Sequence, residues 1–292
     1  MAWLRSADGL ALRGVAWGEG APRGVVLLLQ GRTEYAEKYA RVAADLGAAG
    51  WATATLDWRG QGLSERLWPD RALGHVRRFA DYQWDVDALA GWAGRLAPGA
   101  PRVLLAHSMG GAVGLRALMG GLEVGAAAFS APMWGLRMGA FQRPYAWAVG
   151  ELGRRLGLGG RMTPGQEART YLLRQAFEGN TLTGDRETWE WMRAQAEALP
   201  DAVLGGPSLL WLSEALRETR RLARLASPRV QAVALLGTQE EVVDPAPVRE
   251  RMARWPGGRL VVLEGARHEV LMERAELRGR ALEEVAGAFG GA

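Results

Sequence analysis

Ser108 is the residue whose setting most favours chemistry. An apolar run at residues 103 to 106 leads up to it and Gly110 and Gly111 follow it, so the sequence predicts a strand, a sharp turn and a helix start. A serine at the tip of such a turn has a strained backbone and presents its hydroxyl at the edge of a sheet. Ser108 is therefore a candidate nucleophile. The alternative is that it only caps the helix predicted over residues 109 to 119.

This turn differs from the usual Gly-x-Ser-x-Gly pattern at Ala106, which stands in place of the first glycine. A glycine at that position lets the helix pack closely on the strand, and alanine can do the same if the residue that faces it is small. The departure amounts to one methyl group, so we still expect the turn to form.

A serine hydroxyl needs a base to become a nucleophile, and His268 is the candidate. An imidazole takes the proton, and a carboxylate fixes the tautomer of the imidazole and stabilises its charge. Where the serine sits on such a turn, the chain order is serine, acid, histidine, and His268 follows the last predicted strand, residues 259 to 263. His107 adjoins Ser108, but successive side chains of a strand point to opposite faces. His75 precedes the serine in a polar loop.

Three carboxylates between residues 236 and 245 compete for the role of the acid. Glu240 comes first, at the tip of the turn that leaves the predicted strand, where the chain faces the strand ends. Asp244 precedes Pro245, and this pair is typical of a helix N-cap followed by proline at the first helical position. Glu241 is expected to face solvent. We therefore predict Glu240 as the acid and keep Asp244 as the alternative.

An oxyanion hole needs two backbone amides aimed at the charge that develops on the substrate. The amide of Met109, directly after the nucleophile, is one candidate. The loop after the predicted strand at residues 24 to 30 should supply the other, and Arg32 is the candidate because Gly31 allows close approach of the backbone. The side chain of Arg32 could in addition bind a phosphate or a carboxylate of a substrate, although nothing in the sequence requires it.

Composition narrows the chemistry to serine, carboxylate and histidine. The chain has no cysteine and three histidines, which excludes disulfides and thiolate catalysis and argues against a zinc cluster. With 292 residues, 48% of them apolar, it can bury a large core as one domain or as one domain with an insertion.

The charge pattern bears on partners and location. The formal net charge of +4 rests almost wholly on arginine, because Lys38 is the only lysine, and no block of like charge occurs. This pattern is typical of a solvated surface and predicts no nucleic-acid partner, while it leaves room for transient contact with an anionic membrane surface. The sequence has neither an apolar run of about 18 residues nor a signal peptide, so we expect a cytoplasmic protein, at most peripheral to the membrane. No particular oligomeric state is predicted.

Apolar strands alternate with amphipathic helices over most of the chain. The expected strands are residues 10 to 17, 24 to 30, 51 to 56, 103 to 107, 126 to 130, 230 to 236 and 259 to 263, and the expected helices are residues 35 to 46, 79 to 96, 109 to 119, 248 to 255 and 271 to 289. This alternation predicts an α/β fold with a mostly parallel sheet and helices on both faces. In such sheets ligands bind at the carboxyl ends of the strands.

The alternation breaks down over residues 132 to 226, the cap segment, which otherwise looks helical. It is rich in tryptophan and methionine: Trp134, Trp147, Trp189, Trp191, Trp211, Met133, Met138, Met162 and Met192. These side chains could form the core of an ordinary helical subdomain, or some could line an apolar pocket above Ser108. The position of the segment, after a strand next to Ser108, favours a cap inserted into a core of residues 1 to 131 and 227 to 292.

Together these residues resemble the lysophospholipase L2 and monoacylglycerol lipase branch of the α/β-hydrolases, sometimes grouped with serine aminopeptidases. The resemblance spans nearly the whole chain and is most specific at residues 29 to 39, 57 to 62, 106 to 111 and 268 to 269. Relatives commonly have His where this chain has Gln30, and Asp where it has Glu240, three residues after Gly237. The resemblance implies the α/β-hydrolase fold with a helical cap, hydrolysis of a lipid-like monoacyl ester, and neither metal nor organic cofactor.

Three functions are compatible with these residues. The first is a serine carboxylester hydrolase that cleaves lysophospholipid or monoacylglycerol through an acyl-enzyme intermediate. The second is an aminopeptidase or amidase with the same triad, which would need an acidic anchor for the substrate amine, such as Glu151, Glu178 or Glu190. The third is a non-catalytic binding protein on the same scaffold. Such proteins usually lack a member of the triad, whereas this chain has a candidate for each.

Overall fold

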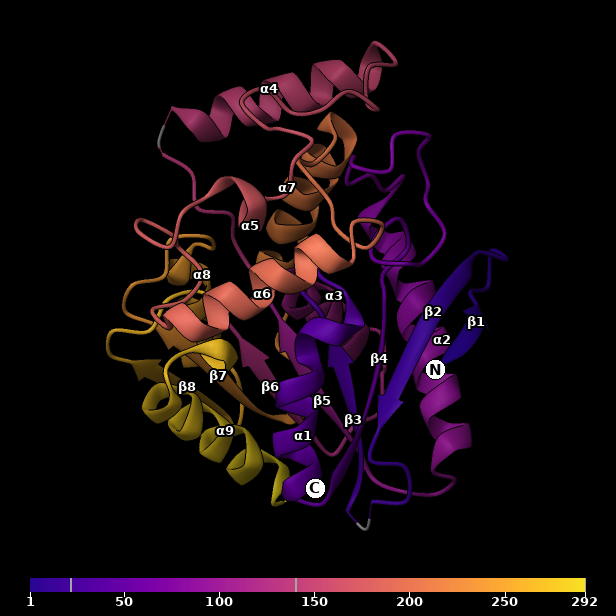
Figure 1. Ribbon diagram of the computed structural model, residues 1–292, viewed down its shortest axis with the longest axis vertical. Coiled ribbons are helices and arrows are strands. Elements are labelled where there is room, and N and C mark those ends of the chain that lie inside the picture. The colour runs from indigo at the N-terminus through magenta and orange to yellow at the C-terminus, as the bar shows by residue number, and fades with distance from the viewer. Residues whose placement is uncertain (22, 140, 292) are drawn as a thin grey trace.

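One mixed sheet forms the centre of the protein in the computed structural model, which describes residues 1–21, 23–139 and 141–291 (Figure 1). The strands are β1 (Ala2–Arg5), β2 (Ala11–Trp17), β3 (Gly24–Leu29), β4 (Trp51–Leu56), β5 (Arg102–His107), β6 (Ala126–Ser130), β7 (Gln231–Gly237) and β8 (Gly258–Leu263). Their order in the sheet is β1-β2-β4-β3-β5-β6-β7-β8. The pairs β1/β2 and β2/β4 are antiparallel and the others are parallel. The predicted mostly parallel sheet is confirmed.

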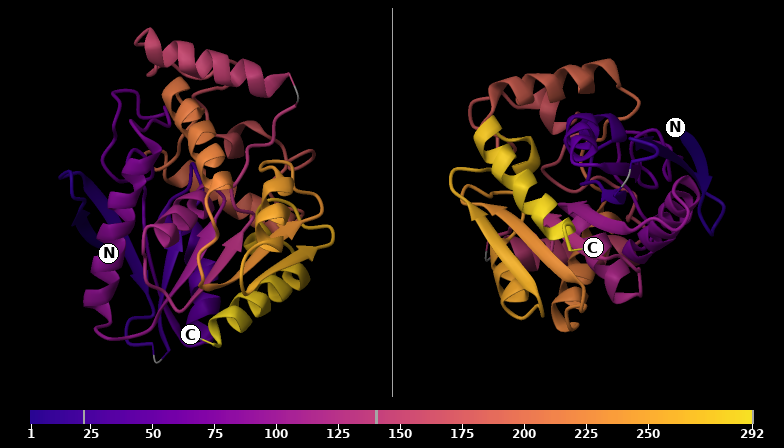
Figure 2. Two further views of the ribbon diagram at one scale, coloured as in Figure 1. Left: turned by 180° about the vertical axis from the view of Figure 1, so that it is seen from behind. Right: turned by 90° about the horizontal axis from the view of Figure 1, so that it is seen from below.

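Helices cover both faces of this sheet. On one face lie α1 and α9, and on the other lie α2, α3 and α8 (Figures 1 and 2). The helices are α1 (Ala40–Ala48), α2 (Tyr82–Leu96), α3 (Met109–Met119), α4 (Gln142–Arg155), α5 (Tyr171–Arg174), α6 (Arg186–Ala198), α7 (Leu209–Arg224), α8 (Pro245–Ala253) and α9 (Ala275–Phe289), with short 3₁₀ helices at Ala36–Tyr39, Phe79–Asp81 and Val270–Met272. Because both faces are covered, every residue of β3 is buried, which accounts for its uninterrupted apolar sequence.

Two departures from the predicted elements have local causes. β1 has no counterpart among the predicted strands, and it forms an edge hairpin with β2 through a turn at Gly9, whose φ of 86° suits glycine. The helix expected from residue 271 begins only at Ala275. Glu273 has an extended backbone, with φ −85° and ψ 178°, and its carboxylate accepts hydrogen bonds from the amides of Gly184 and Arg267, both at 2.9 Å.

Helices α4 to α7 lie between β6 and β7 in the chain and above the carboxyl ends of the strands (Figure 1). Two of them pack closely where Gly150 and Gly153 of α4 face Ser213 and Leu209 of α7. The cap segment thus places a helical layer over the edge at which ligands bind in such sheets.

In the described part of the chain, no helix combines the length and the apolar character needed to cross a membrane.

Candidate active site

Ser108 stands at the turn between β5 and α3 with φ 48° and ψ −117°, a backbone conformation that L-residues rarely adopt. Its amide donates a hydrogen bond to the carbonyl of Ser130 at 3.0 Å, and its carbonyl accepts one from the amide of Met133 at 2.8 Å. The hydroxyl of Ser108 caps none of the amides of α3 described in the structure. The strain therefore serves to present the hydroxyl and not to cap the helix.

Small residues allow α3 to approach the sheet behind this turn. A side chain at Gly110 would collide with the carbonyl oxygens of Leu29 and Gln30. Gly114 faces Ala106, and a methyl group built at Gly114 would stand 3.3 Å from the Ala106 methyl. The residue that faces Ala106 is thus the smallest available, which explains why alanine is tolerated where glycine is usual.

His268 follows β8 and joins the serine to a carboxylate. Its Nε2 lies 3.0 Å from Ser108 Oγ, and its Nδ1 lies 2.8 Å from Glu240 Oε2. Glu240 Oε1 accepts hydrogen bonds from the amides of Val242 and Val243 at 2.6 and 3.0 Å. Burial alone would raise the pKa of Glu240, but His268 and these two amides outweigh it and hold the pKa below its usual value. Glu240 is therefore ionised at neutral pH and able to orient the imidazole.

The competing carboxylates are placed elsewhere. Asp244 caps α8, accepting a hydrogen bond from the amide of Ala246 at 3.1 Å, and pairs with Arg143 at 3.2 Å. Glu241 is exposed. Of the three predicted acid candidates, the structure brings only Glu240 to His268.

The other two histidines do not reach Ser108. His75 Nδ1 lies 3.0 Å from Ser208 Oγ, at the start of α7. His107 Nδ1 lies 3.0 Å from the carbonyl of Ser130, its Nε2 lies 3.4 Å from Glu269 Oε2, and its ring centroid lies 4.8 Å from that of His268. His107 thus packs against the candidate base but makes no hydrogen bond to Ser108 among the described residues, in keeping with the alternation of side chains along a strand.

Backbone amides converge near Ser108 from the loop after β3. The amide of Gly31 donates to Glu34, and that of Thr33 donates to Gln61 Oε1 at 2.8 Å. Between them, the amide of Arg32 has no partner among the described residues. Thr33 has φ 65°, which is rare for a β-branched residue, and its hydroxyl donates to the Arg32 carbonyl at 2.5 Å. This strained loop leaves the Arg32 amide available to a ligand.

Met109 offers the second amide, because it is the first residue of α3 and has no preceding helical turn to donate to. Gln61 connects this residue to the loop after β3, since its Nε2 lies 3.7 Å from Met109 Sδ while its Oε1 accepts from Thr33. Asp57 supports the same region and accepts from the amide of Ala36 at 2.9 Å. The segment at residues 57 to 62 therefore braces the candidate oxyanion hole.

A buried ion cluster lies beside the histidine. The Lys38 ammonium bonds to Glu34 and, at 2.5 Å, to Glu269, and Tyr39 Oη donates to Glu34 at 2.6 Å. Ligand atoms of Glu34, His107 and Glu269 lie within 4.8 Å of one another, a spacing that would also suit a metal ion, but Lys38 supplies the positive charge here. Sequence periodicity does not reveal this cluster. Its one signal is the single lysine in an arginine-rich chain, at a position where a compact ammonium fits between two carboxylates.

The charges of this cluster set one another's protonation. Burial alone would raise the pKa of Glu269, but Lys38 and His107 outweigh it and hold that pKa well below its usual value. Burial alone would lower the pKa of His107, but the carboxylates of Glu269 and Glu34 raise it above its usual value. The cluster thus joins the loop after β3, through Glu34, to the loop of His268, through Glu269.

The cap segment also holds the histidine loop. The amide of Glu269 donates to the carbonyl of Leu182 at 2.8 Å, and the amide of His268 donates to the carbonyl of Thr181 at 3.4 Å. Arg267 Nη1 donates to the carbonyls of residues 180 and 183, each at 3.0 Å. The position of His268 therefore depends on the cap segment as well as on the sheet.

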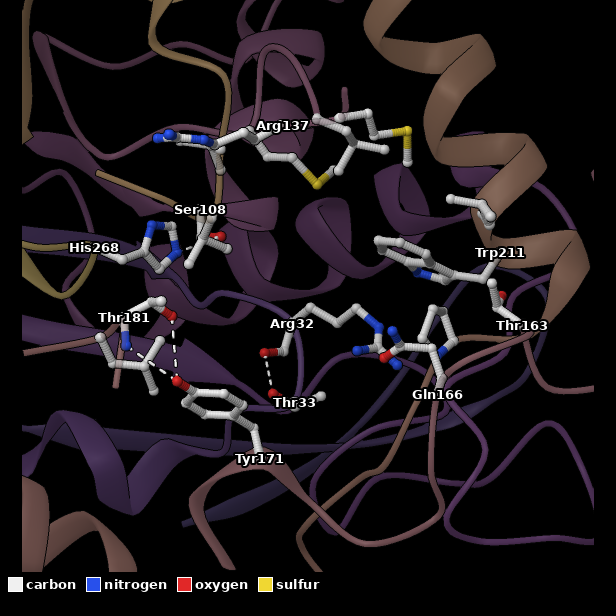
Figure 3. A pocket seen from close by; sticks show the side chains of 18 of the residues that line it. Arg32, Thr33, Ser108, Arg137, Thr163, Gln166, Tyr171, Thr181, Trp211 and His268 are labelled. Carbon is white, nitrogen blue, oxygen red and sulfur yellow. Dashed lines mark hydrogen bonds between the residues drawn. The ribbon is translucent and has the colours of Figure 1, made fainter. Parts of the chain in front are cut away.

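Ser108 and His268 lie in the wall of a cavity of about 640 Å³ between the sheet and the cap segment (Figure 3). Its apolar lining comes mainly from the cap segment: Met133, Leu136, Met138, Tyr145, Ala146, Val149, Pro164, Tyr171, Leu172, Leu182, Pro207, Trp211 and Leu212, with Val242 and Val243 from the loop after β7. Such a cavity suits a largely apolar ligand.

The tryptophans of the cap segment divide between two roles. Of the five, Trp211 alone borders the cavity as described, together with the predicted methionines Met133 and Met138. Trp134 packs on Phe129 at a ring-centroid distance of 5.1 Å and belongs to the main core. The prediction that some of these side chains line an apolar pocket therefore holds for Trp211, Met133 and Met138, and the other four tryptophans lie outside the cavity lining as described.

A serine on a strained turn after a buried parallel strand, within hydrogen-bonding distance of a histidine that follows the last strand, is the arrangement around which α/β-hydrolases are built. The chain belongs to the serine aminopeptidase S33 family of these enzymes, whose sequence pattern matches residues 20–275. Membership of this family confirms the predicted α/β-hydrolase fold.

Individual relatives show which branch of the family the chain resembles in sequence. Lysophospholipase L2 of Escherichia coli (strain K12) is 33% identical over 282 residues, covering 91% of this chain and 80% of that protein. Probable lysophospholipase L2 of Haemophilus influenzae is 30% identical over 280 residues, covering 94% of this chain and 87% of that protein. These relatives place the chain in the branch that the sequence motifs resemble, and they identify it as a serine ester hydrolase.

Solved structures agree on the fold. A soluble variant of monoglyceride lipase from Saccharomyces cerevisiae, in complex with a substrate analog, superposes with a TM-score of 0.77 and is 20% identical, covering 98% of this chain and 93% of that chain. At that identity the likeness concerns the fold alone.

Proposed function

We propose that the protein hydrolyses the carboxylic ester of monoacyl lipids, lysophospholipids or monoacylglycerols, through an acyl-enzyme intermediate on Ser108. The observation that carries the proposal is the hydrogen-bonded series Ser108–His268–Glu240, whose first two residues lie in the wall of an apolar cavity. The name of the relative lysophospholipase L2 supports this substrate class, as does that of a monoacylglycerol lipase of Mycolicibacterium smegmatis, which is 40% identical over 94 residues, 32% of this chain.

The first half of the reaction forms the acyl-enzyme. Ser108 Oγ attacks the ester carbonyl carbon while His268 Nε2 takes its proton, and the charge that develops on the carbonyl oxygen is stabilised by the amides of Arg32 and Met109. His268 then donates that proton to the oxygen of the leaving alcohol as its bond to the acyl carbon breaks. Glu240 holds Nδ1 protonated throughout and stabilises the imidazolium.

The second half releases the fatty acid. Water attacks the acyl carbon and gives a proton to His268 Nε2, the same two amides stabilise the second oxyanion, and the bond to Ser108 Oγ breaks as that oxygen regains the proton. The acyl chain would occupy the apolar part of the cavity formed by the cap segment, because burial of its methylenes is favourable there.

Contact with a lipid surface is proposed for α4, which forms the outer edge of the cap segment (Figure 1). Phe141, Tyr145, Leu152 and Leu156 are exposed and recur at helical spacing, so they share one face. Arg155 at the end of the helix is also exposed. An exposed apolar face beside basic residues is typical of transient membrane contact, which would bring lipid to the cavity.

An amine-anchoring site for aminopeptidase activity finds no support in the cavity as described. Glu151 pairs with Arg154, Arg155 and Arg217 and Glu178 with Arg186, and neither borders the cavity, nor does Glu190. The carboxylates that do border it, Glu34 and Glu269, are both paired with Lys38. This favours an ester substrate.

Labelling and hydrolysis together test the proposal. A fluorophosphonate probe should label the wild-type protein and not Ser108→Ala, and this substitution should lower the hydrolysis of 1-acylglycerol and lysophosphatidylcholine by roughly four to six orders of magnitude. Thermal unfolding is the control, since the packing barely changes. Retention of more than a few per cent of the activity, or faster turnover of an aminoacyl anilide than of either lipid, would contradict the proposal.

A further inference from the structure

The side chain of Arg32 is not used by the mechanism above, which needs only its amide. It extends along the cavity wall, away from Ser108 and His268 and toward Trp211, Thr163 and Gln166 (Figure 3). Its guanidinium carbon lies 5.0 Å from the Trp211 ring centroid, and its Nη2 donates to the carbonyl of Gly205 at 2.9 Å. The cation is thus held at a defined place on the cavity wall.

No carboxylate in the described part of the chain pairs with this cation. Two of the fully buried arginines are neutralised: Arg13 bonds to Asp57 at 2.8 Å, and Arg59 bonds to Asp85 at 2.7 Å. A third, Arg251, instead donates to the carbonyls of Leu222 and Leu225. Arg32 Nε, by contrast, is buried with no hydrogen-bond partner. Burial lowers the pKa of Arg32 to about 10, so the group keeps its charge at neutral pH. Arg32 is half-buried, and a cation removed in part from water without a counter-ion costs free energy that a bound anion would offset.

Glycines surround the Arg32 guanidinium at positions where a side chain would not fit or is absent. A methyl group at Gly74 would collide with Arg32 Nη2, and Gly205 offers its carbonyl to the same nitrogen. Both glycines lie on segments that meet here, since the amide of Gly205 donates to Ala72 and that of Gly74 to Gly206. The guanidinium therefore occupies a niche and does not merely fill surface space.

Two further polar residues, Thr163 and Gln166, line the cavity with Arg32. The hydroxyl oxygen of Thr163 is buried and makes no hydrogen bond within the described residues. Gln166 is exposed and also lines the cavity, on the side toward which the Arg32 side chain extends (Figure 3). A guanidinium, a hydroxyl and an amide supply charged and neutral donors from different directions, which is the donor set that binds phosphate oxygens.

The spacing relative to the ester fits a glycerophospholipid. If the ester carbonyl oxygen is bound by the Arg32 amide, the guanidinium of the same residue is at most one arginine side chain away, a reach that a headgroup phosphate joined to the ester through glycerol can also span. We propose that Arg32, Thr163 and Gln166 form a subsite for the headgroup phosphodiester of a lysophospholipid. This rests on the proposed function and makes lysophospholipids, not monoacylglycerols, the preferred substrates.

The test compares two lipids that share one acyl chain. We would measure kcat/KM for 1-palmitoyl-lysophosphatidylglycerol and for 1-palmitoylglycerol in the same non-ionic mixed micelles. Arg32→Met keeps the backbone amide and removes the charge, so the ratio of the two values should fall by roughly 10- to 100-fold, as expected for loss of hydrogen bonds to a charged group. Thr163→Val should lower the ratio by a smaller factor, and it keeps the test valid if Arg32→Met does not fold.

Arg137 provides the matched control, because it borders the same cavity but is bonded to the carbonyl of Glu240. Arg137→Met should change both lipids in proportion and leave their ratio within about twofold of the wild type. As a second readout, glycerol 3-phosphate at millimolar concentration should raise the Tm of the wild type, glycerol should not, and Arg32→Met should abolish the rise.

The possible outcomes separate this inference from the proposed function. A wild type that cleaves the monoacylglycerol, with a lipid ratio unchanged by Arg32→Met and Thr163→Val, would overturn the phosphate subsite and leave the hydrolase intact. A ratio that fell equally in Arg137→Met would also overturn it. If neither lipid were cleaved, the proposed function would fail, and the thermal shift with glycerol 3-phosphate would still decide whether Arg32 binds the anion.

Discussion

Replacing Glu240 by Gln changes one atom of the proposed acid and leaves its size unchanged. In the wild type, Oε1 accepts from two backbone amides at 2.6 and 3.0 Å, and Oε2 faces His268 Nδ1 at 2.8 Å. The glutamine oxygen should remain with the two amides, because an amide NH₂ there would oppose two donors. The NH₂ group then faces Nδ1, which must become an acceptor. His268 would carry its proton on Nε2 and could not take one from Ser108.

The expected loss follows from this change of tautomer. An asparagine in place of the aspartate of a comparable serine triad costs about 10⁴ in kcat. We expect Glu240→Gln to lower kcat by roughly 10³- to 10⁴-fold, which corresponds to about 4 to 5.5 kcal/mol of transition-state stabilisation. KM should change little, because Glu240 does not border the cavity as described.

Asp244→Asn is the matched control, since it makes the same change four residues away. Asparagine caps helices about as well as aspartate, and the pair with Arg143 is partly exposed, so the rate should stay within about twofold and stability within about 0.5 kcal/mol. The assay is the initial rate on a p-nitrophenyl ester together with the rate of fluorophosphonate labelling. If Asp244→Asn lost activity while Glu240→Gln kept a tenth or more of it, Asp244 would be the acid.

The acyl pocket, the buried lysine and the exposed face of α4 can be tested separately. Specificity constants for esters of graded length should rise by up to threefold to fourfold per methylene until the pocket is full, and Trp211→Ala should flatten this profile; a flat wild-type profile would refute an acyl pocket. Lys38→Met leaves two buried carboxylates without their counter-ion, so we expect the free energy of unfolding at pH 7 to fall by about 3 to 5 kcal/mol. Burial alone would raise the pKa of Glu269, but Lys38 outweighs burial and holds that pKa well below its usual value. Ionised Glu269 therefore stabilises the fold above pH about 4.3, and this contribution is lost as the pH falls through the lower pKa of the folded state. Lys38→Met should therefore shift acid unfolding to higher pH, and urea titrations between pH 3 and 8 that were unchanged would contradict this. Phe141→Asp with Leu156→Asp should weaken co-sedimentation with anionic vesicles severalfold, and equal binding would exclude α4 as the contact.

The sequence by itself determined the features that depend on local pattern. Uninterrupted apolar runs such as residues 24 to 29 predict strands covered on both faces. The apolar run before Ser108, together with the two glycines after it, predicts the strained turn. The order of serine, acid and histidine narrowed the triad candidates, because each follows a strand at the same edge of the sheet. The Asp244–Pro245 pair likewise predicts the helix cap that the structure contains, since both effects act within one turn of chain.

Only the tertiary structure decided which distant side chains meet. Lys38, Glu34 and Glu269 form one ion cluster although more than two hundred residues separate the first from the last, and no local pattern records that pairing. The cap segment is a second example, since its Trp211 borders the cavity and its other tryptophans do not. The sequence could not separate them, because every buried tryptophan has the same apolar side chain. The role proposed for the Arg32 side chain depends on the absence of a paired carboxylate among the described residues, and that is a property of the packed chain. Proximity in space arises from long-range packing, and so the structure was needed to identify the unpaired cation.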